Sequence, residues 1–256
     1  MGGERARSDF ARHLAMALEV WRRSPGIIVV TAVFGAVVCA PVDHAAYLLV
    51  LFPVSLFFVG FMGTQRLWYV RTSDGDVMTG REVWRSSWAY SWRFAVLGLL
   101  MGLAMTPVLL LGASGGGWAV HAAGIAVVAL QDVVLSFVTP ALTVTTSSVR
   151  KAWGIGWSFL TRDFSRLRWH FLAPPLAVMF AAQTLPALSE TVWAAAAVSA
   201  FGALLNLLFK GAQVFAYVEH AGNHIEAGRS RGRRAFERSG IPRGKGELRS
   251  PPSRQS

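Results

Sequence analysis

Apolar residues in this chain gather into long blocks that are separated by segments rich in arginine. A hydrocarbon layer about 30 Å thick selects blocks of roughly twenty residues, because each residue advances a helix by about 1.5 Å. The pattern therefore predicts six transmembrane helices. They cover Pro25–Ala40, Ala45–Gly63, Phe94–Leu111, Trp118–Pro140, His170–Leu188 and Thr191–Val218. The first block has only about 16 residues and needs help from its flanks to span.

A second pattern precedes the first, third and fifth blocks. Apolar residues there recur at steps of three and four, with arginine on the remaining face, which is typical of helices lying in the membrane interface. The N-terminal stripe contains Phe10, Leu14, Leu18 and Trp21, the segment near 78–93 carries Trp84, Trp88 and Trp92, and the segment near 146–168 carries Trp153 and Trp157. We interpret these tryptophans as interfacial anchors. The alternative is that any short basic loop between spans looks amphipathic.

Each predicted interfacial helix is followed by a hairpin of two spans, so the chain reads as three repeats of one unit. The fold class expected from the sequence is all-α, a polytopic membrane protein with six transmembrane and three interfacial helices. Its parts are a cytoplasmic interfacial helix at 1–24, a transmembrane domain at 25–220, and a disordered basic tail at 221–256.

Positive charge predicts the orientation. Of the 25 Lys and Arg residues, five precede the first span, five lie between spans two and three, five lie between spans four and five, and nine follow His220. The last is Lys210, and the alternate loops contain none. Cytoplasmic loops of membrane proteins carry the excess of Lys and Arg. We therefore expect a multi-pass protein of the inner or plasma membrane with both termini in the cytoplasm.

Three stretches carry a resemblance to a known group. FVTPALTVTTSSVRKAWGIGWSFLTRDFSRLRWHF, GTQRLWYVRTSDGDVMTGREVW and QVFAYVEHAG together resemble the bacterial glycerophosphoryl diester phosphodiesterase membrane-domain family and its YciC-like relatives. In that resemblance Pro140 and the segment Ser147 to Trp157 take the places of a proline near the end of span four and the amphipathic helix after it. The layout is also similar to that of YesL-like proteins. The resemblance implies six spans and no catalytic site, because in the phosphodiesterases the chemistry belongs to a separate domain.

Polar residues inside two spans are the candidate site. Span four contains Gln131 and Asp132, and span six contains Asn206, Lys210 and Gln213 on one helical stripe. Asp132 and Lys210 each lie eight residues inside the cytoplasmic ends of their spans, roughly 12 Å deep, so neighbouring spans would bring them together. Three interpretations remain open: a pair that specifies helix packing, a proton or substrate site of a transporter, and a lysine that reaches the interface without Asp132.

Other chemistry is sparse. Cys39 is the single cysteine, and His220 and His224 are one turn apart without a third ligand, so neither a disulfide nor a metal is expected. We find no hydrolase, zinc-protease or phosphate-loop motif and expect no catalytic residues and no cofactor. The expected function is therefore non-enzymatic, in membrane organisation or as a partner subunit or homo-oligomer, with anionic lipid and not nucleic acid as ligand. A small transporter with its site in the polar cluster is the alternative.

Overall fold

The computed structural model describes residues 2–38, 45–113, 117–188 and 191–236, and Cys39 lies outside these residues. Every regular element in them is helical, so the all-α prediction is confirmed for this part of the chain. The elements are α1 (Gly2–Arg23), α2 (Gly26–Val38), α3 (Ala45–Ser73), α4 (Gly80–Ala113), α5 (Trp118–Leu135), α6 (Val138–Pro140), the π-helical turn η1 (Ala141–Thr145), α7 (Val149–Arg162), α8 (Phe164–Leu188) and α9 (Val192–Phe236).

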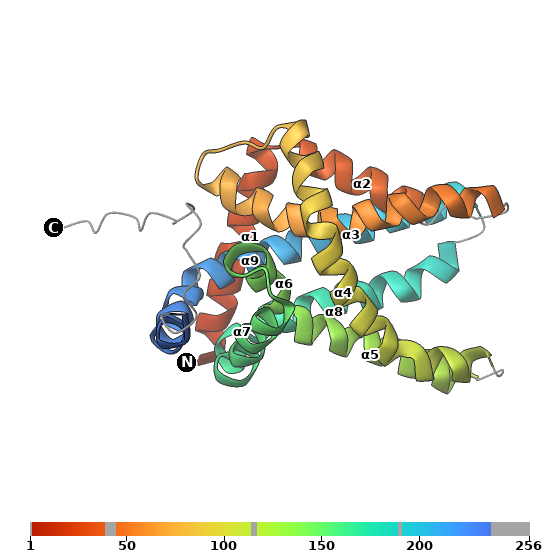
Figure 1. The fold of residues 1–256 in the computed structure, drawn as a ribbon. Coiled ribbons are helices and arrows are strands. Elements are labelled where there is room, and N and C mark those ends of the chain that lie inside the picture. The colour runs from red at the N-terminus through yellow and green to blue at the C-terminus, as the bar shows by residue number, and fades with distance from the viewer. Residues whose placement is uncertain (1, 39–44, 114–116, 189–190, 237–256) are drawn as a thin grey trace. The chain divides into compact units, whose positions relative to one another are not determined.

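The chain divides into two units, residues 1–219 and residues 220–256. In the first unit α3 packs against α4, α5 packs against α8, and α1 contacts both α3 and α8 (Figure 1). Two buried hydrogen bonds join three of these elements: Trp21 Nε1 donates to Tyr69 Oη at 2.7 Å, and Tyr69 Oη donates to the Leu207 carbonyl at 3.0 Å. Tyr69 therefore links α1, α3 and α9 at the centre of the core.

Glycine allows the close crossing of α3 and α4 that Figure 1 shows. A β-carbon at Gly60 would overlap the backbone oxygen of Ser87, and one at Gly63 would lie 2.8 Å from the Phe94 ring. Such distances are far below normal van der Waals separation, so a side chain at either position would push the helices apart.

Fewer helices have the length and composition of a membrane span than the sequence pattern predicts. Among the described residues, Ala196–Ala221 is long and apolar enough to cross a membrane, and Ala122–Leu135 with Val138–Thr145 qualifies as a pair bent by 48°. The apolar helix Gly26–Ala36 is shorter. The molecule is thus a helical protein with one or two helices of membrane-spanning character, and the six-span layout stays a prediction.

The second repeat differs from the expected plan. The interfacial segment near 78–93 and the span Phe94–Leu111 form one continuous helix, α4. In the first repeat Ser24 and Pro25 separate α1 from α2, and in the third Asp163 separates α7 from α8. The sequence around Arg93 and Phe94 contains no proline or glycine, so nothing interrupts the backbone hydrogen bonds there.

The buried face of α1 also differs from the predicted stripe. Ala6, His13, Ala17 and Val20 are buried, whereas Leu18 is 44% exposed. Phe10, Leu14 and Trp21 of the predicted stripe are half-buried, so the buried face is displaced from the stripe and not opposite to it. A β-carbon on Gly211 of α9 would lie 2.9 Å from the Ala17 methyl group, so α1 and α9 approach closely at Ala17.

One further boundary differs. Span four, expected to run from Trp118 to Pro140 as one helix, breaks after Leu135 and continues as α6 and the π-helical turn η1. Helix α9 extends to Phe236, and the disordered tail from residue 221 stays a prediction. Residues 237–256 lie outside the described part.

Candidate functional site

Asp132 and Lys210 lie in direct contact. Lys210 Nζ is 2.7 Å from Asp132 Oδ1, and the side chains are only 9% and 18% exposed, respectively. The pair joins α5 to α9, and the equal depth of the two residues in a membrane stays a prediction. Taking an ammonium and a carboxylate out of water is costly, and the short contact offsets much of that cost.

Gln213 lies one helical turn beyond Lys210 and extends the polar contact. Its Nε2 atom donates to Ser136 Oγ at 2.8 Å and to the His170 carbonyl at 2.6 Å, and Ser136 Oγ donates to the Asp132 carbonyl at 2.8 Å. One buried amide therefore holds α5, α8 and α9 together. Its Oε1 atom is buried without a hydrogen-bond partner among the described residues.

The remaining two candidates lie apart from this contact. Gln131 Nε2 donates to the Met101 carbonyl at 3.0 Å, so it binds α5 to α4. Asn206 is half-buried, and its Oδ1 atom has no partner in the described part of the chain. The predicted cluster of five thus reduces to a core of Asp132, Lys210 and Gln213.

Arg66 is a further buried charge that acts on the Asp132 and Lys210 pair, and it was not among the site residues predicted from the sequence. It is 4% exposed, its guanidinium lies 5.5 Å from the centre of the Phe94 ring, and it donates to the Met62 carbonyl. Its charge also attracts Asp132 and repels Lys210, so two buried cations act on one half-buried carboxylate. Arg66 comes three residues after the second predicted span, and its position led us to count it among the cations of the cytoplasmic loop.

A second buried polar group was also missed. His13 Nδ1 is 3.0 Å from His170 Nε2, and His13 Nε2 is 2.9 Å from Glu219 Oε2. Arg12 closes the group with two bonds to the Glu219 carboxylate, at 2.7 and 2.9 Å. These residues come from α1, α8 and α9. Phe10 of the predicted stripe packs against His170 with ring centroids 5.0 Å apart, but the stripe contained only apolar residues and so gave no sign of His13 beside it.

The predicted interfacial anchors lie on the outside of the molecule. The exposed fractions are 58% for Trp84, 40% for Trp88, 75% for Trp92 and 51% for Trp157, and Trp153 is half-buried. The rings of Trp84 and Trp88 pack against Phe57 with centroids 4.8 and 5.9 Å apart. Their depth in a membrane stays a prediction.

No family model matches this chain, and neither a curated protein nor a solved structure shows a significant match. Among the described residues, no three His, Cys, Asp or Glu side chains are grouped so that they could hold a metal ion.

Proposed function

We propose that this chain is a non-enzymatic, multi-pass protein of the cell membrane that binds anionic lipid and membrane partners. The observation that supports this most is the outward direction of large apolar side chains on helices from five of the six predicted spans. A water-exposed surface of this kind is unusual, whereas lipid chains favour it. The exposed residues include Val29, Val33, Leu99, Leu103, Leu110, Trp118, Leu130, Leu176, Trp193 and Phe201.

The proposed layout keeps six spans with both termini in the cytoplasm. Charge segregation supports this orientation, because the loops expected outside contain no Lys or Arg. The resemblance to membrane-domain and YesL-like proteins agrees with the layout. In this arrangement the exposed tryptophans of α4 and α7 take headgroup depth, next to arginines that attract anionic lipid.

In this proposal the polar core has a packing role. Asp132, Lys210 and Gln213 have partners on three helices, so they fix how α5, α8 and α9 meet. Buried polar groups specify packing in this way where apolar helices would otherwise slide past each other.

Transport is the second candidate, and one observation favours it. Three buried polar atoms near the Asp132 and Lys210 pair have no hydrogen-bond partner among the described residues. They are Gln213 Oε1, Asn206 Oδ1 and Arg66 Nε. Buried polar atoms of this kind are normally satisfied, so a bound solute or water would supply what the protein does not. A transported solute would then be anionic, because the core holds two cations and one carboxylate.

Thiol labelling tests the main proposal. Thr191 is the first residue of the sixth predicted span, at the end expected outside, and Ser73 lies between the second and third predicted spans, in the segment expected inside; both are exposed. A cysteine at Thr191 should react with a membrane-impermeant maleimide on intact cells, and a cysteine at Ser73 should not.

A further inference from the structure

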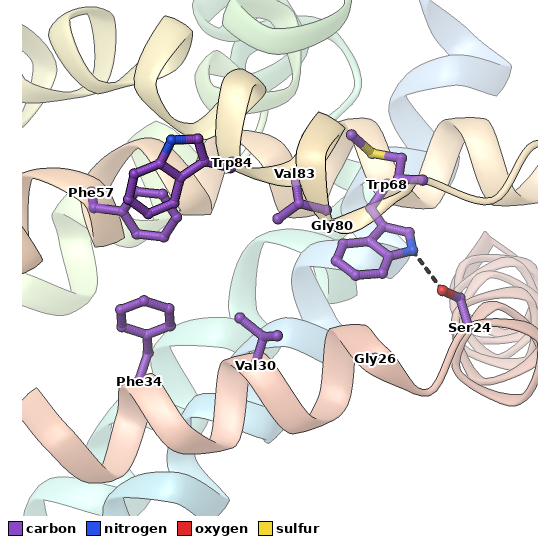
Figure 2. Close-up of a pocket in the computed structure, with 10 residues that line it drawn as sticks. Ser24, Gly26, Val30, Phe34, Phe57, Trp68, Gly80, Val83 and Trp84 are labelled. Carbon is purple, nitrogen blue, oxygen red and sulfur yellow. Dashed lines mark hydrogen bonds between the residues drawn. The ribbon is translucent and has the colours of Figure 1, made fainter.

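An open apolar groove lies between α2, α3 and the start of α4, with a volume of about 510 Å³. Figure 2 shows Val30 and Phe34 from α2, Phe57 and Trp68 from α3, and Val83 and Trp84 from α4 around it. The indole of Trp68 donates to Ser24 Oγ at 2.8 Å, so the polar atoms of both side chains are satisfied at one end. Most of the groove is therefore lined by apolar atoms, which favour an apolar ligand.

The groove reaches the surface at Trp84, which is 58% exposed. Val29 and Val33 are not among the lining residues and lie on a neighbouring, exposed face of α2, with 61% and 56% of their surface exposed. The lining of α2 extends from Gly26 to Phe34, eight residues or about 12 Å along the helix. This length is less than half of a hydrocarbon layer about 30 Å thick, so it fits part of one acyl chain in a single leaflet.

The polar end of the groove is basic. Arg22 and Arg23 end α1 just before Ser24, and Arg81 follows Gly80 at the start of α4. Glu19 is 2.9 Å from Arg23 and 3.9 Å from Arg22, which is 83% exposed, whereas Arg81 forms no ion pair in the described part of the chain. Exposed arginines within two residues of the lining residues Ser24 and Gly80 could reach a lipid phosphate at this end, and arginine can bind a phosphate through two nitrogens.

We propose that this groove binds one acyl chain of an anionic phospholipid of the cytoplasmic leaflet, with the phosphate beside Arg22 and Arg81. The inference rests on the proposed membrane location and names the site where lipid binds. The C-terminal segment of this chain suits the groove poorly, because its sequence after Phe236 has no apolar block. A second copy of the chain is the competing occupant.

The test measures retained lipid by native mass spectrometry of the full-length chain in detergent. Phosphatidylglycerol and phosphatidylcholine with identical acyl chains are added in equal amounts. Val30→Trp fills the groove, and Val33→Trp is the matched control, because it adds the same ring to the same helix on the exposed face. Retention of phosphatidylglycerol should fall roughly tenfold in Val30→Trp and stay unchanged in Val33→Trp. Thermal stability and elution volume of both variants show that they are folded.

A charge variant tests the headgroup. The double variant Arg22→Gln, Arg81→Gln should keep lipid in the groove but bind phosphatidylglycerol no better than phosphatidylcholine. Wild-type retention in Val30→Trp, or equal losses in both tryptophan variants, would overturn the proposal. A dimer that dissociates in Val30→Trp while lipid retention is unchanged would assign the groove to a second copy instead. These failures leave the membrane proposal standing, since the latter depends on thiol labelling from outside the cell.

Discussion

Removing one charge of the Asp132 and Lys210 pair should destabilise the fold by an amount that depends on which charge is removed. The pair is 2.7 Å apart with 9% of the lysine side chain and 18% of the aspartate side chain exposed. Breaking a buried pair by removing one partner costs about 3–5 kcal/mol, and the partial exposure of Asp132 places the expected loss near the lower end. We therefore expect about 3 kcal/mol for Lys210→Gln.

Asp132→Asn should be worse than Lys210→Gln. Arg66 still attracts the carboxylate when Lys210 is neutral, whereas loss of the carboxylate leaves Lys210 and Arg66 as two buried like charges. The double neutral variant removes the unpaired lysine charge and should recover part of the loss. The expected coupling between the two sites is about 1–3 kcal/mol.

The assay is a double-mutant cycle on purified protein in nanodiscs, with the free energy of unfolding and the folded yield as measurements. Gln131→Leu with Lys210→Gln is the matched control, because Gln131 precedes Asp132 but binds the Met101 carbonyl on α4. That control pair should be additive. Purely additive losses for Asp132 and Lys210 would refute the pairing. A folded double neutral variant that loses a solute flux carried by the wild type would favour transport over packing.

Two further predictions concern the contact of α3 with α4 and the start of α4. Gly60→Ala should destabilise the protein by roughly 1–3 kcal/mol or more in thermal unfolding, because its β-carbon would overlap the Ser87 carbonyl, while Gly98→Ala, which meets nothing within 4 Å, should be neutral or stabilising. At the start of α4 the pKa of Glu82 is lowered from 4.5 to about 2. The causes, largest first, are hydrogen bonds from the backbone N–H of Thr79, from the Thr79 hydroxyl and from Arg71. A carboxyl whose pKa is lowered in the folded state stabilises the fold at pH values above its pKa in the unfolded state. The stability advantage of the wild type over Glu82→Gln should therefore be complete above about pH 5 and vanish as the pH falls toward 2. An advantage that is independent of pH would contradict this.

Sequence reasoning reached the Asp132 and Lys210 contact by a depth argument that needs only helix rise and span direction. It could not reach Arg66, since a count of residues cannot tell whether a cation near a span end points to the loop or turns inward. The His13, His170 and Glu219 group depends on residues more than 150 positions apart that meet only through tertiary packing. Long-range contacts of this kind leave no periodic signal in the chain.

Helix boundaries could be predicted where the sequence contains a helix-breaking residue such as proline. Pro25 separates α1 from α2 as the pattern predicts, but the absence of any breaker near Arg93 let α4 continue through the expected boundary. The face of α1 was predicted from large apolar residues, and the buried face is displaced from them toward Ala17, which lies close to Gly211 of α9. Size complementarity between helices is a pairwise property and is not visible in one segment.

The membrane topology is the central claim, and thiol labelling tests it most directly. Thr191→Cys and Ser73→Cys are each made with Cys39→Ser, so that the introduced cysteine is the only thiol. The account predicts that an impermeant maleimide labels Thr191→Cys on intact cells, and that it labels Ser73→Cys only after the membrane is permeabilised. The reverse order, or equal labelling of both before permeabilisation, would contradict it.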